Sequence, residues 1–377
     1  MRVTFVLPHA NLSGGTRVVA MYARKLTERG HRVCVVSGPT PRPTVRDRVR
    51  AILRGRLLPL GGRAEESHLD GLEIEHRVLD RQRPVVDADV PDAEVIVATW
   101  WETAEWIRSL SRSKGAQAYF IQHDETVFFP PEATEGRRRV EATWHFPVHK
   151  FAVAKWLSEL GVRRGVGDPI AVVPNAVDHD VFCAPPRGKQ PVPTVGFMYS
   201  TTRFKGCDTA LGAIALVREK IPALRVKAFG LDEPSESLPM PPGAEYFHKP
   251  AQARLPEIYA SCDAWLFSSR SEGFGLPILE AMACRTPVIA TPAGPAPDLL
   301  GAGGGVLVRP DDAGDMARAI EEVVTQPEQR WRDLSSAAYA NAARFTWDQS
   351  TTLLEQTLAE AVARSRAGDR ARVPVSS

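Results

Sequence analysis

The 377-residue sequence predicts an α/β protein built from two doubly wound domains, each around its own parallel sheet. Short apolar runs of strand length alternate with longer amphipathic stretches through both halves of the chain. A polar, proline-rich segment, residues 185–193, has the composition of a linker between the halves. The length also suits two domains of ordinary size. We therefore expect an N-terminal domain over 1–184 and a second domain over 194–346.

The composition indicates a globular protein that does not bind nucleic acid. Charged residues make up 24% of the chain and the net charge is only +2, so nucleic acid is not an expected partner. The five cysteines are scattered and lack metal-ligand spacing, which is typical of reduced thiols. The first residues show no secretory pattern, and no apolar run reaches membrane-spanning length. These observations predict a cytoplasmic protein.

The N-terminus reads as a β-α-β unit. A strand over 3–7 leads through a loop to Gly14 and Gly15, which open a helix that ends before a second strand over 32–36. Two glycines at a helix N-terminus can cradle a phosphate or another ligand, or simply form a tight turn. A nicotinamide site is not indicated, because it needs Gly-x-Gly-x-x-Gly and an acidic residue after the second strand. Both are missing here.

Residues 41–63 are rich in arginine and contain one acidic residue, Asp47. Leucine and isoleucine are interspersed, so this stretch could be a basic amphipathic surface for anionic lipid or an acidic acceptor. A solvated loop and helix is the alternative. The arginines are Arg42, Arg46, Arg48, Arg50, Arg54, Arg56 and Arg63.

Two further strands are expected over 94–98 and 118–121. The second ends at Gln122-His123-Asp124-Glu125. Ligands of open parallel sheets lie beyond the carboxyl ends of the strands, so His123 is placed to line a cleft. A structural histidine is the alternative. A strand over 151–153 and the segment 171–178 complete the first domain.

The second domain begins with a strand over 194–198, followed by Arg203 and Lys205 just before a helix. Cations in that position could neutralise a departing diphosphate, or could be ordinary surface charge. More strands are expected over 226–230, 244–247, 264–267, 287–290 and 304–308, and helices over 311–324, 328–344 and 347–363. The tail over 365–377 is expected to be disordered.

One stretch, residues 271–284, carries the most specific chemistry. Gly273 and Gly275 flank Phe274, so the backbone can approach a ligand closely. Pro277 suits the first turn of a helix, whose free amides at Gly275 and Leu276 would favour an anion such as a diphosphate. Glu272 precedes this turn and Glu280 lies about one turn inside it. Two carboxylates beside an anion site indicate hydroxyl partners, such as a ribose and a sugar.

This Glu-x7-Glu stretch resembles the signature of the family-4 retaining glycosyltransferases, which have the two-domain GT-B fold. The resemblance implies that Glu280 holds the ribose of the donor and that Glu272 lies at the donor sugar. It also implies that the backbone of Gly273, Phe274, Gly275 and Leu276 contacts that sugar and its phosphate. Residues 120–130 are similar to those of a bacterial polysaccharide and rhamnosyl-type subset.

The same resemblance extends to the first domain and to the loop before the first helix of the second. It implies that His123 lies near the anomeric centre and that Lys205, with Arg203, stabilises the leaving diphosphate. It places the Gly14-Gly15 loop at the cleft and makes the helix over 347–363 cross back to the first domain.

The implied reaction moves a sugar from a nucleoside diphosphate sugar to an acceptor hydroxyl, with retention. The resemblance favours a UDP-sugar, with a GDP- or dTDP-sugar as alternatives. The acceptor would be a glycan, a lipid-linked glycan or a small molecule. No cofactor and no metal are expected, since the two Asp-x-Asp strings at 87–89 and 178–180 are weak evidence for one. A sugar-nucleotide epimerase, a phosphorylase-like enzyme and a non-catalytic binding protein are the other hypotheses.

Overall fold

The computed structural model describes residues 1–40 and 66–372. The basic stretch Arg42–Arg63 lies outside the described residues, so its membrane contact stays a prediction. The chain divides into two compact units. The first contains Met1–Ala152, Leu160–Val173 and the chain from Thr351; the second contains Val153–Glu159 and Pro174–Ser350.

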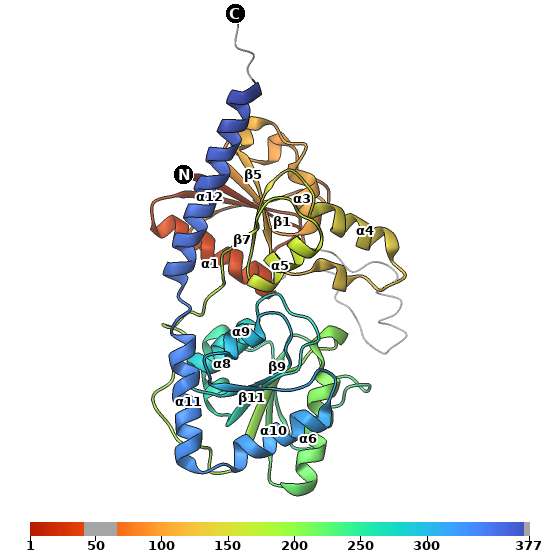
Figure 1. Ribbon diagram of the computed structural model, residues 1–377, viewed down its shortest axis with the longest axis vertical. Helices are drawn as coiled ribbons and strands as arrows, with labels where there is room; N and C mark the ends of the chain where they lie inside the picture. Colours follow the sequence, from red (N-terminus) through yellow and green to blue (C-terminus); the bar gives the residue numbers. More distant parts are fainter. Residues whose placement is uncertain (41–65, 373–377) are drawn as a thin grey trace, which may run out of the picture. The chain divides into compact units, whose positions relative to one another are not determined.

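The first unit is a parallel α/β sheet in the order β3-β2-β1-β4-β5-β6-β7 (Figure 1). Its strands are β1 (Arg2–Leu7), β2 (Arg32–Ser37), β3 (Glu75–Val78), β4 (Val95–Ala98), β5 (Ala116–Ile121), β6 (His149–Ala152) and β7 (Ala171–Val172). Its helices include α1 (Gly14–Glu28), α3 (Trp101–Ile107), α4 (Thr134–Thr143) and α5 (Lys155–Arg163), the last of which is shared between the units. β1 pairs with both β2 and β4, so the strand order reverses at β1.

The second unit is also a parallel α/β sheet, in the order β10-β9-β8-β11-β12-β13. Its strands are β8 (Thr194–Met198), β9 (Arg225–Gly230), β10 (Glu245–His248), β11 (Ala264–Phe267), β12 (Val288–Ala290) and β13 (Gly305–Leu307). Its helices are α6 (Cys207–Lys220), α7 (Leu255–Ala260), α8 (Leu276–Ala283), α9 (Ala296–Leu300), α10 (Ala313–Thr325) and α11 (Glu328–Ala342). The two predicted doubly wound parallel sheets are confirmed.

Burial explains why the central strands are apolar runs rather than alternating ones. Every residue of β4, β11 and β12 is buried, since helices cover both faces of a parallel sheet. The core of the second unit joins β8, β9 and β11 to α6 and α10, with Phe197, Ile214 and Ile320 almost fully buried.

The segment 185–193, predicted as a linker, is packed on the second unit. The Asp263 carboxylate, just before β11, accepts the backbone N–H of Gln190 at 2.7 Å and of Thr194 at 2.8 Å. Arg187 donates to the Cys262 carbonyl at 2.5 Å and to the Thr286 hydroxyl at 2.8 Å. These bonds fix the entry of the chain into β8.

The last helix, α12 (Trp347–Arg372), is longer than predicted (Figure 1). Residues 365–372, expected in a disordered tail, are helical, because alanine and arginine favour helix and the first proline comes only at Pro374. From Thr351 the helix belongs to the first unit. There Glu355 accepts from His31 at 2.7 Å and from Arg29 at 2.6 Å.

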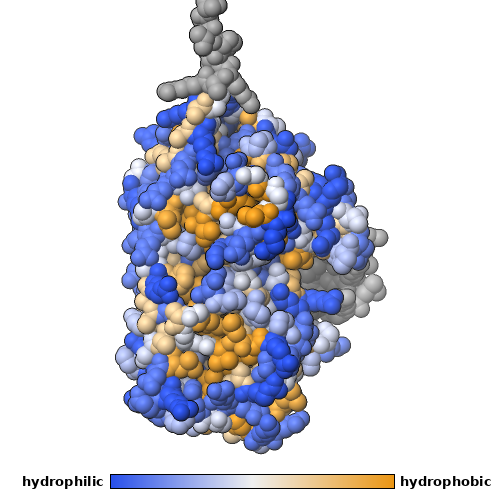
Figure 2. Space-filling model, viewed as in Figure 1, coloured by the Kyte–Doolittle hydropathy of each residue, from blue (hydrophilic) through white to orange (hydrophobic). Residues whose placement is uncertain are grey.

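The surface is mixed in character. Figure 2 shows a largely hydrophilic face interrupted by separate apolar areas. Among residues 1–40 and 66–372, no helix has both the length and the apolar composition that crossing a bilayer requires.

Candidate functional site

Two loops meet where the strand order of the second sheet reverses. β8 and β11 are hydrogen-bonded neighbours, with Leu266 opposite Phe197. The loop after β8 carries Lys205, and the loop after β11 carries Glu272. The carboxyl ends of strands at such a reversal form the usual ligand crevice of doubly wound sheets. The topology therefore brings together two residues that the sequence predicted for one site.

Lys205 and Glu272 form a direct ion pair. The Lys205 ammonium donates to a Glu272 carboxylate oxygen at 2.7 Å, and the two side chains are only 21% and 13% exposed. The same oxygen lies 3.4 Å from the Ser269 hydroxyl, and the other accepts the Gly273 N–H at 3.3 Å. Glu272 is thus held by its own loop and oriented towards the cation of the neighbouring loop.

Two glycines let three loops approach one another. Gly206 has φ +65°, and a Cβ there would collide with the Ser268 carbonyl oxygen. Gly294, after β12, has φ +57°, and a Cβ there would collide with the carbonyl oxygen of Glu272. Only glycine combines this left-handed backbone with so close an approach. The backbone around Glu272 is therefore enclosed from both neighbouring strand ends.

Helix α8 begins at this site as the sequence predicts. Its N-cap is Gly275 with φ +84°, Pro277 lies in the first turn, and no side chain caps the helix N-terminus. Phe274 and Leu276 are buried, so these two side chains anchor the loop on the second unit. Uncapped first-turn amides and the positive end of the helix dipole favour an anion here.

Trp156 also contacts this loop, a role that the sequence analysis did not predict. The Trp156 indole, in the first turn of α5, donates to the Gly273 carbonyl at 2.9 Å. Residues Val153–Glu159 belong to the second unit, unlike the rest of α5. A tryptophan at the start of a helix usually indicates packing, so no sequence pattern distinguishes this residue as a loop anchor.

Glu280 is buried rather than solvated. It is 2% exposed, and one of its oxygens accepts the Tyr259 hydroxyl of α7 at 2.8 Å. Glu280 is therefore not a solvent-exposed residue of α8. The ribose-binding role stays a prediction. Arg203, in the short 3₁₀ turn Arg203–Lys205, is exposed.

The predicted residues of the first unit lie at the carboxyl ends of its strands. Gly14 and Gly15 open α1 after the N-cap Ser13, and Gly15 lies against the Gln122 side chain. His123 follows β5; its Nδ1 donates to the Asp124 carbonyl at 3.0 Å, and its ring packs against Phe128 with centroids 5.1 Å apart. The structure therefore gives His123 a defined orientation within this unit.

Glu125, two residues beyond His123, is a buried acid that sequence reasoning did not single out. One of its oxygens accepts the Trp101 N–H at 2.7 Å and lies 3.2 Å from the Tyr119 hydroxyl. Burial raises the pKa of Glu125 well above its ordinary value. The only sequence signal was its position directly after the β5 strand end.

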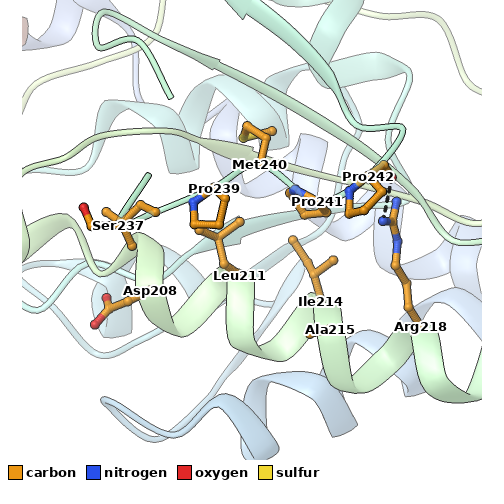
Figure 3. A pocket seen from close by; sticks show the side chains of 11 residues that line it. Asp208, Leu211, Ile214, Ala215, Arg218, Ser237, Pro239, Met240, Pro241 and Pro242 are labelled. Carbon is orange, nitrogen blue, oxygen red and sulfur yellow. Dashed lines mark hydrogen bonds between the residues drawn. The ribbon is translucent and has the colours of Figure 1, made fainter. Parts of the chain in front are cut away.

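A separate hollow of about 630 Å³ lies on the second unit between α6 and the segment 237–242. Leu211, Ile214 and Met240 face it, and Asp208 and Arg218 border it (Figure 3). None of the predicted site residues lines this hollow. The polar site after β8 and β11 is therefore distinct from the apolar hollow.

Replacing Gly206 by alanine should destabilise the second unit more than the same change at Gly243. Both glycines have a left-handed backbone, with φ +65° and +69°, but a Cβ at Gly243 would meet nothing within 4 Å. Gly243→Ala should cost about 1–2 kcal/mol from the backbone alone. Gly206→Ala should cost a further ~1–3 kcal/mol from the clash with Ser268. Urea unfolding of both variants measures the difference, and equal costs would contradict the close approach of the two loops.

Replacing Glu125 by glutamine should stabilise the protein increasingly as the pH rises. A raised pKa in the folded state means that the unfolded chain ionises first, so stability falls as the pH increases above about 4.5. Glu125→Gln cannot ionise, so its advantage over the wild type should open by ~1.4 kcal/mol per pH unit until the folded acid also ionises. Urea unfolding between about pH 4 and pH 8 measures it. Glu132→Gln, at an exposed position, should show no such trend; a constant gap for Glu125→Gln would contradict the raised pKa.

Parts of this sequence are similar to known glycosyltransferases. Residues 186–341 match the family model described as glycosyl transferases group 1. The chain is 30% identical over 238 residues to a D-inositol 3-phosphate glycosyltransferase from Stackebrandtia nassauensis, covering 56% of this chain and 53% of the relative. It is 34% identical over 99 residues to O-antigen chain mannosyltransferase B from Escherichia coli, covering 26% and 25%. The chain thus spans about half the length, or less, of these curated relatives.

Solved structures match over nearly the whole chain. Sucrose-phosphate synthase from Thermosynechococcus elongatus has a TM-score of 0.71 at 17% identity, covering 97% of this chain and 100% of that one. The Anabaena protein HepE, solved with UDP and glucose, has a TM-score of 0.71 at 16% identity, covering 96% and 100%. At sequence identities of 16–17%, these similarities show a shared fold and nothing more. This chain therefore has the GT-B fold, and residues 186–341 of its second unit match the family model of the group 1 glycosyl transferases.

Proposed function

We propose that the protein is a retaining glycosyltransferase that transfers a sugar from a nucleoside diphosphate sugar to an acceptor hydroxyl. The observation that carries this proposal is the Lys205–Glu272 ion pair beside the uncapped N-terminus of α8. A cation and a helix N-terminus are suited to a diphosphate, and a held carboxylate is suited to sugar hydroxyls.

The ion pair suggests how the site receives its donor. Without ligand, Glu272 neutralises Lys205, which avoids an unpaired, half-buried charge. A diphosphate at the start of α8 would take Lys205 as its partner. Glu272 would then exchange the ammonium for hydroxyl groups of the sugar. Both groups remain satisfied before and after binding, as buried polar groups must be.

Catalysis would follow from the charge that develops on the leaving group. The bond between the anomeric carbon and the diphosphate oxygen breaks, and a bond from that carbon to the acceptor oxygen forms. Lys205 and the first amides of α8 would stabilise the negative charge of the released nucleoside diphosphate. The proton of the acceptor hydroxyl would pass to an oxygen of the departing diphosphate, so that atoms and charge balance. His123 in the first unit is the residue we propose near the anomeric carbon, and Glu280 the one we propose at the ribose.

The donor and acceptor are proposed at the level of chemical class. Structural neighbours solved with UDP or UDP-glucose favour a UDP-sugar over a GDP- or dTDP-sugar. The names of the relatives include an inositol phosphate and a polysaccharide chain. We therefore propose a hydroxyl of a glycan, a lipid-linked glycan or a small polyol as the acceptor.

Thermal-shift screening against UDP-, GDP-, ADP- and dTDP-sugars should identify one nucleotide class that stabilises the protein. A ligand at ~100 times its Kd should add ~2.7 kcal/mol. Lys205→Ala should weaken this shift and lower the transfer rate by ~10²–10³, because a charge-stabilising donor is lost. Product formation distinguishes a transferase from a binding protein, and products that are isomers of the donor would indicate an epimerase.

Lys220→Ala is the matched control for Lys205→Ala. Lys220 lies in the same unit and pairs with Glu321 at 2.9 Å, but its side chain is 66% exposed on α6. Lys220→Ala removes the same charge as Lys205→Ala but outside the proposed site, so binding and turnover should stay at the wild-type level. If no sugar nucleotide stabilised the wild-type protein and none were turned over, the proposed function would be wrong.

A further inference from the structure

Arg270 lies in the loop after β11, two residues before Glu272. The guanidinium forms ion pairs with Asp208 at 2.7 Å and with Asp311 at 2.5 Å. It also donates to the Arg203 carbonyl at 2.6 Å. One side chain therefore connects the loop after β11 with three other segments of the second unit.

The backbone of Arg270 makes a further contact with the same turn. Its N–H donates to the Phe204 carbonyl at 2.7 Å. Two consecutive carbonyls of the turn Arg203–Lys205 are thus held by one residue, one through the side chain and one through the backbone. Lys205 is the next residue in that turn.

Asp208 and Asp311 fix the direction of the guanidinium. Asp208 lies in the first turn of α6, directly after the turn that carries Lys205 (Figure 3). Asp311 precedes α10 and has a left-handed backbone with φ +56°. The hydrogen bond from Arg270 lowers the pKa of Asp208, so this carboxylate stays charged as a partner. Arg270 itself is 25% exposed, whereas the side chains of Asp208 and Asp311 are 56% and 60% exposed, so solvent and salt partly screen both pairs.

We propose that Arg270 is a positioning residue for Lys205: by holding the turn Arg203–Lys205 against the loop of Glu272, it sets where the ammonium meets the donor diphosphate. This rests on the proposed function for its catalytic consequence. Arg270 does not itself contact the donor in this proposal. The position of an ammonium relative to a developing charge matters because electrostatic stabilisation falls as the separation grows.

The structural part can be tested without any substrate. The amides of Lys205 and Gly206 donate to Thr202 and Arg203 in the native turn, so they are protected from hydrogen exchange. Arg270→Ala should increase exchange in a peptide covering this turn several-fold. Arg309→Ala is the control, because Arg309 is 67% exposed and pairs with Asp312 and Asp315 at the start of α10 rather than with the turn Arg203–Lys205. Unchanged exchange in Arg270→Ala would overturn the proposal.

The catalytic part is tested by a double-mutant cycle with Lys205. Arg270→Ala should lower kcat ~10-fold or more, with a smaller effect on the KM for the donor. Arg270→Lys should restore only part of the loss, because a compact ammonium cannot reproduce the fixed, planar fork of a guanidinium. In the Lys205→Ala background, Arg270→Ala should have almost no further effect on kcat. Additive losses would instead indicate a merely structural role and contradict the proposal.

The two proposals fail in different ways. If Lys205→Ala lost activity while Arg270→Ala kept both wild-type kcat and wild-type exchange, only the role of Arg270 would be wrong. If the wild type turned over no sugar nucleotide, the proposed function would be wrong, and the exchange experiment would still decide whether Arg270 holds the turn.

Discussion

The candidate site depends on one topological constraint, the reversal of strand order between β8 and β11. Lys205 and Glu272 are separated by 67 residues, and the pairing of β8 with β11 brings their loops to the same part of the sheet edge. Because the strands are parallel, every loop that follows a strand emerges at the same edge. A cation after one strand and a carboxylate after its neighbour are then close enough to pair.

That edge would carry excess positive potential without Glu272. The ammonium of Lys205 and the uncapped start of α8 both present positive charge at one place. Glu272 balances it while the site is empty, and a bound diphosphate would balance it when the site is filled. The ion pair is therefore better understood as a placeholder for an anionic ligand than as a source of stability, since partly exposed pairs of this kind contribute little.

Hydrophobic patterns predicted the parts of the fold that are buried. The strands over 194–198 and 264–267 were predicted with the bounds that the structure shows, because they lie in the centre of a covered sheet. β3 was missed because it is an edge strand, Glu75-His76-Arg77-Val78, with mostly exposed side chains. α4 was missed because Val140 and Thr143 are its only buried residues, too few for a helical period. A hydrophobic pattern reveals an element only where its side chains are buried, and β3 and α4 bury few side chains.

The candidate site also contains residues that the sequence predicted and residues that it did not. Glu272, Lys205 and the glycines were found because they follow predicted strands directly, where backbone geometry and local spacing limit the choices. Arg270, Trp156 and Glu125 were not found, because each acts through a contact with a segment distant in the sequence: Asp311, Gly273 and Trp101.

No sequence periodicity connects two residues that are distant in the chain. A single arginine or tryptophan can also have many structural roles, so its presence alone predicts none of these contacts. What holds the loops in place is largely polar: carbonyls bound by guanidinium and indole, with glycines at the points of closest approach. Bonds of this kind depend on direction as well as distance, so they orient a loop more specifically than non-directional apolar contacts do. A site that must place one ammonium accurately therefore has reason to be built from contacts that sequence patterns reveal least.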